Sequence, residues 1–376
     1  MNQGVSLAIR LAAGVLQPNH PSTLILFVTS RCNCRCSFCF NLENVVGGKK
    51  DNELTLDSIR KIAKSMQPLT QMVLSGGEPF LRRDMPEIVE AFYGLAGLRQ
   101  VSIPTNGALP KRIPGATEQI LKACPELIVN VNISLDAIGE EHDRARELPG
   151  CFENICETYR LLAAVRERFD RLSINIQTVV MRKNVHAVMD LVEYIKEHFD
   201  VNYHSLGLVR GDVGEQEHDY DIAEAEAAVD AHYSKNGGVN KSLPVLASGA
   251  RGVLSLVRKL QFEAEQKKTR SFECLAGRKL VVISDEGNLL ACEPLAFEPV
   301  TRGGRDKDDF VIAQLQDFDY DVEKALQSPK ALEIKKYIAD KRCWCLYGCA
   351  MQNSIVYSPK MYPRLAKEIV RQIGHQ

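Results

Sequence analysis

The sequence has no excess of charge of either sign, no long apolar run and no internal repeat. Among its 376 residues, 47 basic and 48 acidic side chains give a formal net charge of −1. A surface that binds nucleic acid or an acidic membrane usually appears in the sequence as a basic excess, so neither partner is expected. No apolar run is long enough to span a bilayer, and the absence of repeats and low-complexity tracts excludes repeat architectures.

What is present is an ordinary globular composition with an uneven distribution of cysteine. Hydrophobic residues are 45% and charged residues 25% of a chain long enough for one large domain or two ordinary ones. Twelve cysteines would indicate a disulfide scaffold only in a short secreted protein. Here they gather at residues 32–39 and 343–349, which favours metal ligation in a reducing, cytoplasmic compartment.

The N-terminal region contains one mildly amphipathic stretch, from Val5 to Leu16. It lacks the charge and cleavage pattern of a signal peptide. We expect a terminal helix packed on the body of the protein, with a membrane-surface helix as the alternative.

The first cysteine group lies in residues 32–39, the cysteine loop, where Cys32, Cys36 and Cys39 have the spacing C-x3-C-x2-C. Three thiolates are one fewer than a [4Fe–4S] cluster usually takes from a protein, so one iron would stay free to bind a substrate or cosubstrate. Zinc is the alternative, but a structural zinc site usually has four protein ligands in two spaced pairs. No second pair follows nearby.

With Phe38 before its third cysteine, the cysteine loop resembles the signature of the radical S-adenosylmethionine (SAM) superfamily. The resemblance implies that the open iron binds the amino and carboxylate groups of SAM and that Phe38 lies near the adenine. It also implies reductive cleavage of SAM to a 5′-deoxyadenosyl radical, which abstracts hydrogen from a substrate. An electron donor such as flavodoxin or ferredoxin is the partner that this chemistry implies.

Apolar strands and amphipathic helices alternate six times between about residues 22 and 211. Such alternation predicts an α/β fold with a parallel sheet and crossover helices. The resemblance further implies a partial (β/α)6, TIM-like barrel of the radical SAM type. The expected strands are residues 24–28, 72–74, 101–103, 128–135, 172–180 and 203–209, and the expected helices include residues 55–66, 86–96, 152–169 and 184–199.

A second motif, Ser75-Gly76-Gly77-Glu78-Pro79, follows the second expected strand. Glycines at a strand end let a ligand approach the backbone closely, and Glu78 adds charge. An ordinary strand-ending turn is the alternative. The motif resembles the GGEP motif of the superfamily, which implies that Gly76, Gly77 and Glu78 bind the amino group of SAM.

Polar residues also stand at the ends of later strands. Thr105 and Asn106 come after the third strand, and Ser134 and Asp136 come at the end of the fourth. They resemble the superfamily positions that contact the ribose and carboxylate of SAM, and Gln177 on the fifth strand is a further candidate. Turn or capping roles are the alternative for each, because Asn-Gly and Asp are common in turns.

The second cysteine group lies near the C-terminus and consists of Cys274, Cys292, Cys343, Cys345 and Cys349. Its first two members flank residues 279–290, which predict a hairpin with a glycine turn. The arrangement resembles the auxiliary-cluster domain of the SPASM and twitch radical SAM enzymes, whose full pattern has seven cysteines. Five cysteines cannot fully ligate two four-iron clusters, so one auxiliary [4Fe–4S] cluster is expected.

The expected ligands of the auxiliary cluster are Cys274, Cys292, Cys345 and Cys349, with Cys343 as the spare. Zinc held by four of these cysteines is the alternative. Among the other cysteines, Cys156 is expected in the core. Cys34 is surplus to the three-ligand rule, with a role as a hydrogen-atom donor as the alternative.

The expected organisation is an N-terminal helical segment (residues 1–21), a radical SAM core (22–211), a helical bridge (212–272), a small α+β auxiliary iron–sulfur domain (273–352) and a C-terminal helix (353–376). We expect a radical SAM enzyme that acts on a small molecule, because the first strand begins too early for a preceding peptide-recognition domain. The auxiliary cluster would aid oxidation or bind substrate. The alternatives are a maturase of a ribosomally made peptide and, from another class, a non-catalytic cysteine-rich metal-binding or redox-sensing protein.

Overall fold

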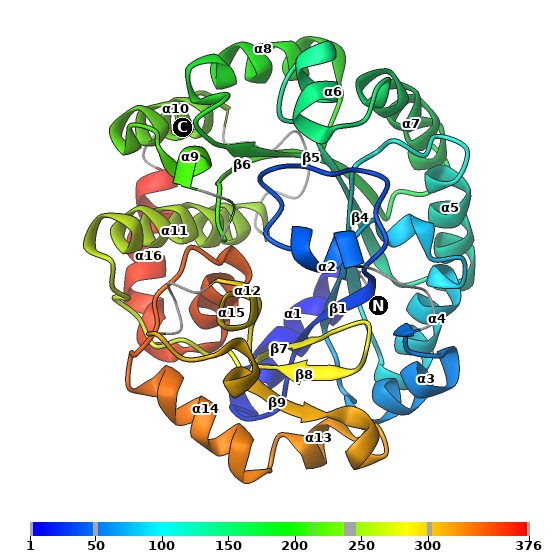
Figure 1. The fold of residues 1–376 in the computed structure, drawn as a ribbon, viewed down its shortest axis with the longest axis vertical. Helices are drawn as coiled ribbons and strands as arrows, with labels where there is room; N and C mark the ends of the chain where they lie inside the picture. Colours follow the sequence, from blue (N-terminus) through cyan, green and yellow to red (C-terminus); the bar gives the residue numbers. More distant parts are fainter. Residues whose placement is uncertain are drawn as a thin grey trace.

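The protein is built around one nine-stranded sheet with the strand order β6-β5-β4-β3-β2-β1-β7-β8-β9 (Figure 1). The computed structural model describes residues 3–47, 52–211, 213, 215–236, 246–298 and 303–373. The first six strands are parallel, and each pairs with the next in sequence. They are β1 (Thr23–Thr29), β2 (Gln71–Gly76), β3 (Gln100–Thr105), β4 (Ile128–Ser134), β5 (Leu172–Val180) and β6 (Tyr203–Leu208).

Crossover helices cover the outer face of these strands, as the ring of ribbons in Figure 1 shows. The spacing of apolar residues explains their orientation: in the first of them, Ile59, Ile62 and Ala63 are buried against the sheet. Thr55 caps this helix, because its Oγ1 accepts a hydrogen bond from the Ser58 amide at 3.2 Å. The main crossover helices are α3 (Leu56–Ser65), α4 (Met85–Ala96), α5 (Ile113–Ala123), α7 (Cys151–Arg166) and α8 (Val188–His198).

The alternation read from the sequence is confirmed as a partial barrel of parallel strands. Strands β6 and β9 lie at the two ends of the strand order, so the sheet in the described part of the chain does not close. All seven residues of β1 are buried, whereas β3 and β4 alternate buried and half-buried positions. The pattern fits a central strand covered on both faces, with neighbours whose second face lines the barrel interior.

The C-terminal region continues the same sheet, which the sequence did not predict. Strand β7 (Leu280–Ile283) pairs in parallel with β1, and β8 (Asn288–Leu290) returns antiparallel to it. This is the expected hairpin, and β9 (Val311–Gln314) extends it. The cysteines on either side of the hairpin are therefore joined directly to the barrel. The expected domain boundaries stay a prediction, and residue 212 lies outside the described residues.

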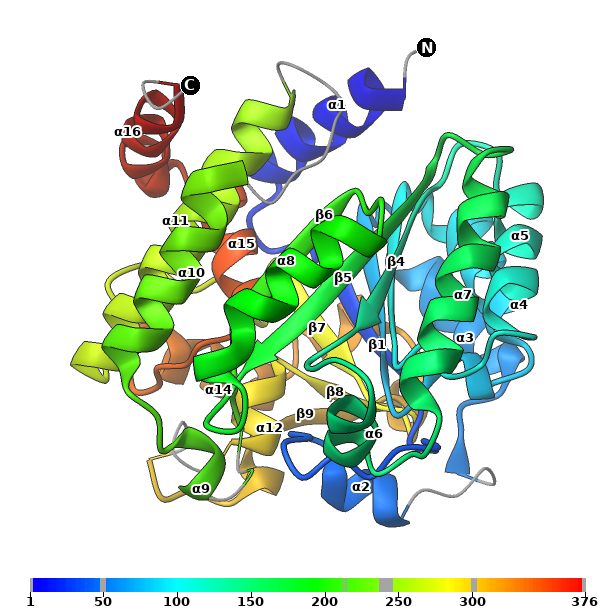
Figure 2. The same cartoon turned by 90° about the horizontal axis from the view of Figure 1, so that it is seen from above.

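The remaining helices lie around the main crossovers and at the open side of the barrel, where α11, α15 and α16 are found (Figure 1). Figure 2 shows α11 running alongside α16, and α11 also packs on α15. The stretch expected as one C-terminal helix is two, because Pro359 cannot continue the helix and disfavours helical backbone at Ser358. These helices are α1 (Gln3–Leu16), α2 (Leu42–Gly47), α6 (Glu140–Arg146), α9 (Glu215–His218), α10 (Ile222–Asn236), α11 (Leu246–Lys267), α12 (Glu293–Phe297), α13 (Val322–Ala325), α14 (Pro329–Ala339), α15 (Gly348–Tyr357) and α16 (Tyr362–Ile373). None of the helices in the described ranges has the length and apolar character to cross a membrane.

Candidate active site

The cysteine loop leaves the carboxyl end of β1, the edge where parallel α/β sheets place their chemistry. Cys36 and Phe38 are buried in a small apolar cluster with Met181 from the end of β5. Cys32 and Cys39 pack against the same cluster. The three cysteines of the C-x3-C-x2-C spacing therefore border one locus.

The glycines of the second motif are explained by contacts with the root of the cysteine loop. The Gly77 amide donates to the Thr29 carbonyl at 2.7 Å, and the Glu78 amide donates to the Arg31 carbonyl at 2.9 Å. A Cβ on Gly77 would lie 2.1 Å from the Arg31 carbonyl oxygen, and one on Gly76 would lie 2.2 Å from that of Thr29. Gly76 also has φ +112°, which only glycine adopts readily. The close approach here is between two backbone segments.

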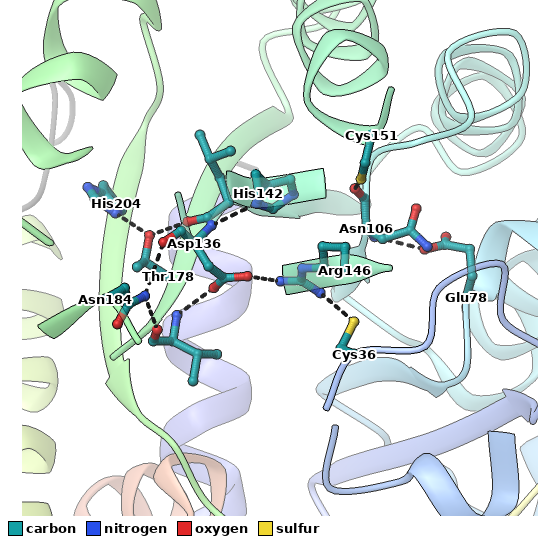
Figure 3. A network of polar contacts seen from close by, with 12 residues as sticks. Cys36, Glu78, Asn106, Asp136, His142, Arg146, Cys151, Thr178, Asn184 and His204 are labelled. Carbon is teal, nitrogen blue, oxygen red and sulfur yellow. Dashed lines mark hydrogen bonds and ion pairs between the residues drawn. The ribbon is translucent and has the colours of Figure 1, made fainter. Parts of the chain in front are cut away.

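Glu78 joins the ends of β2 and β3. Its carboxylate accepts hydrogen bonds from Thr105 Oγ1 at 2.9 Å and from the Asn106 amide at 2.8 Å. Only 1% of Glu78 is exposed, and burial raises its pKa to about 7, against the opposing effect of the hydrogen bond from the Asn106 amide. Asn106 then reaches the cysteine loop, where its Nδ2 donates to Asn33 Oδ1 at 2.8 Å and lies 3.9 Å from Cys32 Sγ. Figure 3 shows the Glu78–Asn106 contact beside the loop.

The other predicted SAM-contacting residues fall into two groups. Ser134 and Gln177 are register partners on β4 and β5, half-buried and exposed respectively. Asp136 is 1% exposed, and both of its carboxylate oxygens are occupied: one accepts from the Val179 amide at 2.9 Å and the other pairs with Arg146. Contact of these residues with SAM stays a prediction, and for Asp136 the structure supplies a different partner.

Arg146, at the end of α6, is a site residue that the sequence reading missed. Its Nη1 donates to Cys36 Sγ at 3.7 Å, and its guanidinium lies 5.1 Å from the centre of the Phe38 ring. No motif marks this arginine, since Cys36, the thiol that it contacts, is 110 positions earlier in the chain.

The thiols of the cysteine loop suit a group that binds thiolates. A hydrogen bond from Cys34 lowers the pKa of Cys32 to about 6 and also lowers the pKa of Cys36. Burial raises the pKa of Cys39 to about 11. The donors aimed at Cys32 and Cys36 would stabilise negative charge on sulfur, as in the ligands of an iron–sulfur cluster. No three His, Cys, Asp or Glu side chains in the described ranges are close enough to hold a single metal ion.

The C-terminal cysteines are all free thiols, and three of them act electrostatically on a fourth, Cys292. Burial, followed by the charges of Cys345, Cys274 and Cys343, holds the pKa of Cys292 well above its usual range. Burial likewise raises the pKa of Cys343 and of Cys349, each to about 11. Positively charged iron or zinc would offset this repulsion and keep the thiols deprotonated. The binding of a positively charged cluster would therefore be favoured by these thiols.

Arg210 connects the two cysteine regions. Its guanidinium lies 4.2 Å from the centre of the Phe40 ring and 4.8 Å from that of Tyr347. It forms ion pairs with Glu298, at 2.9 Å, and with Glu293. Phe40 directly follows the cysteine loop, Glu293 follows the second C-terminal cysteine, and Tyr347 stands between the last two. One half-buried cation therefore contacts residues that flank both cysteine groups.

Comparison with protein families adds the deciding observation: residues 26–195 match the radical SAM superfamily model. The chain contains a radical SAM domain. Residues 26–195 are therefore similar to a domain whose cofactors are a [4Fe–4S] cluster and SAM. The matched residues include the cysteine loop, Gly76–Glu78 and Asp136.

Curated relatives carry two different activities in their names. The GTP 3′,8-cyclase of Marinobacter nauticus is 33% identical over 175 residues, which cover 46% of this chain and 49% of that protein. The AdoMet-dependent heme synthase of Methanosarcina barkeri is 28% identical over 303 residues, which cover 77% of this chain and 80% of that protein. The chain spans about half the length of the two GTP 3′,8-cyclases that head its relatives.

Solved radical SAM structures share the fold over almost the whole chain. The structure of anSMEcpe with bound AdoMet superposes with a TM-score of 0.59 and 16% identity, covering 93% of this chain and 96% of that one. Streptococcus suis SuiB bound to its precursor peptide SuiA superposes with a TM-score of 0.54 and 16% identity, covering 93% of this chain and 74% of that one. At such identities the likeness concerns the fold alone.

Proposed function

We propose that this radical SAM enzyme cleaves SAM reductively at the cysteine loop and abstracts hydrogen from a small-molecule substrate, with the C-terminal cysteines holding one auxiliary [4Fe–4S] cluster. A reduced cluster at Cys32, Cys36 and Cys39 supplies the electron for SAM cleavage when both cofactors are bound. The protein's own part is to hold the three thiols at one locus and to pack the Gly76–Glu78 turn against the root of the cysteine loop.

The observation that carries the auxiliary-cluster proposal is the position of Arg210. Its contacts with Phe40 and Tyr347 support a second cluster close to the first, because each of these residues neighbours one of the two cysteine groups. A second cluster there would face the reaction site. It could accept an electron from a substrate radical or bind the substrate directly.

Cys343 and Cys349 are the two candidates for the fourth ligand of this cluster. The charges of Cys274 and Cys343 act on both Cys292 and Cys345 and raise the pKa of each, after the larger effect of burial. Arg270 Nη1 already donates to Cys343 Sγ at 3.5 Å. We retain Cys349 as the fourth ligand, and replacing each candidate separately with alanine identifies the thiol whose loss removes four irons from the protein.

A small-molecule substrate is supported by the relatives whose names specify one. The heme synthase of Methanosarcina barkeri matches over 77% of this chain, and the cyclase relatives are named for GTP. The second candidate is a peptide substrate, favoured by the shared fold with SuiB bound to its precursor peptide.

Deuterium transfer tests the proposal directly. Anaerobically reconstituted protein is incubated with reductant, SAM and deuterated candidate substrates of both classes, and 5′-deoxyadenosine is analysed by mass spectrometry. Deuterium in 5′-deoxyadenosine identifies the substrate class and the position of abstraction. Formation of no 5′-deoxyadenosine at all, from protein that holds its iron, would overturn the proposed chemistry.

A further inference from the structure

We propose that Arg146 is a positioning residue that holds Cys36 and, by its charge, makes the first cluster easier to reduce, with Asp136 as the counter-charge that limits this effect. The inference rests on the proposed function, because it concerns the cluster at Cys32, Cys36 and Cys39. Asp136 would then influence the reduction potential of the cluster through its ion pair with Arg146.

Arg146 contacts the cysteine loop in three ways. Its carbonyl oxygen accepts a hydrogen bond from the Arg35 amide at 3.2 Å. Its Nη1 donates to Cys36 Sγ at 3.7 Å, and its guanidinium stacks on Phe38 with 5.1 Å to the ring centre. These contacts reach neighbouring parts of the loop from one residue: the main chain of Arg146 binds the Arg35 amide, and its side chain contacts the Cys36 thiol and the Phe38 ring.

The ion pair with Asp136 fixes Arg146 in turn. Asp136 lies beyond the end of β4, where its Oδ1 accepts from the Val179 amide at 2.9 Å. Asn184 donates to the Asp136 carbonyl at 3.0 Å, and Thr178 donates to the preceding carbonyl at 2.6 Å. Figure 3 shows this chain of contacts running from the β5 and β6 side through Asp136 and Arg146 to Cys36. The carboxylate is thus anchored on the sheet, and the arginine bridges it to the loop.

Charge and burial set the direction of the effect. One-electron reduction makes a [4Fe–4S] cluster more negative, so a cation beside a ligand sulfur stabilises the reduced form and raises the reduction potential. Arg146 touches Cys36, whereas Asp136 lies on the far side of the guanidinium. Arg146 is 8% and Asp136 1% exposed, so water screens neither charge strongly. Glu78, buried near Cys32, and Glu217, which accepts a hydrogen bond from Ser37 of the loop at 2.8 Å, are further carboxylates beside the loop.

Two single substitutions should move the potential in opposite directions. Arg146→Gln removes the positive charge and leaves Asp136, so the first cluster should be harder to reduce and its midpoint potential more negative. Asp136→Asn removes the counter-charge and leaves Arg146 against the thiol, so the midpoint potential should become more positive. A purely structural role for either residue would not produce shifts of opposite sign.

The measurement is an anaerobic redox titration of reconstituted protein followed by electron paramagnetic resonance at fixed pH, with dithionite as the source of electrons. The spectrum of the Cys32→Ala, Cys36→Ala, Cys39→Ala triple variant is subtracted, which isolates the first cluster. Arg171→Gln is the matched control, because Arg171 is a half-buried arginine that binds backbone carbonyls of residues 121, 124 and 127 at the other end of the barrel. The midpoint potential of the first cluster in the Arg171→Gln variant should equal that in the wild type.

Arg146→Lys is a second variant in case Arg146→Gln does not fold. Its midpoint potential should lie between those of the wild type and Arg146→Gln, because lysine keeps the positive charge without the planar guanidinium. Equal potentials in the wild type, the Asp136→Asn variant and the Arg146→Lys variant would overturn the inference. Shifts of Asp136→Asn and Arg146→Gln in the same direction would also overturn it. Absence of iron from the wild-type protein would instead contradict the proposed function, so the two failures are distinguishable.

Discussion

Gly77→Ala is the substitution whose effect follows most directly from the coordinates. The new methyl carbon would lie 2.1 Å from the carbonyl oxygen of Arg31 and 2.5 Å from its carbonyl carbon. Both are backbone atoms, so no side chain can rotate away, and the turn and the root of the cysteine loop must separate. Forced overpacking of this kind typically costs about 1–3 kcal/mol. With rigid backbone on both sides, we expect about 3 kcal/mol, at the upper end of that range.

Gly94→Ala is the matched control. Gly94 lies inside α4, and no atom lies within 4 Å of the position that its Cβ would occupy. Alanine is favoured over glycine in a helix interior by about 0.5–1 kcal/mol. The control should therefore melt slightly above wild type, while Gly77→Ala should melt roughly 5 °C or more below it.

The assay combines the melting temperature with iron content and SAM cleavage. Gly77→Ala should lose SAM cleavage more severely than stability, because the separated loop carries the thiols. If Gly77→Ala melts with the wild type and retains both iron and SAM cleavage, the turn does not pack on the cysteine loop as described, and the reasoning is refuted.

Three further predictions concern individual residues. The Cys32→Ala, Cys36→Ala, Cys39→Ala triple variant should retain about four irons but form no 5′-deoxyadenosine, whereas Cys34→Ala should cleave SAM nearly as wild type; cleavage by the triple variant would contradict the site. Replacing Cys292 and Cys349 together should abolish product while leaving some unproductive SAM cleavage, provided that circular dichroism stays near native; product at the normal rate would favour a structural zinc site. Burial raises the folded-state pKa of Glu78 to about 7. Between the pKa of Glu78 in the unfolded chain and pH 7, the folded protein therefore keeps a proton that the unfolded chain has released. The free energy of unfolding falls as pH rises through that window. Glu78→Gln should make the free energy of unfolding fall less between pH 5 and 8, by up to ~3 kcal/mol, in melting curves measured across that range. The same dependence of stability on pH in wild type and variant would contradict this prediction.

Local patterns in the sequence were enough to predict most of the barrel. Each strand of the first six is an apolar run followed by a turn, and each crossover helix has its own apolar face, so neither needs information from elsewhere in the chain. The cysteine loop and the Gly76–Glu78 turn were predicted for the same reason, since each is a short contiguous motif.

The missing features depend on contacts between distant residues. The pairing of β7 with β1 joins residues 280–283 to residues 23–26, and no local pattern in either strand specifies that partner. Arg146 and Arg210 look like ordinary arginines until the fold brings Cys36 or Phe40 beside them. The role of the two glycines was likewise predicted as ligand approach, whereas the structure places backbone of residues 29–31 against them.

Iron content and SAM cleavage, measured together on one anaerobically reconstituted preparation, test the central claim most directly. Two four-iron clusters predict about eight irons per chain and reductant-dependent formation of 5′-deoxyadenosine from SAM. About four irons with cleavage intact would remove the auxiliary cluster from the account. Zinc in place of iron, with no 5′-deoxyadenosine formed, would contradict the claim that this chain is a radical SAM enzyme.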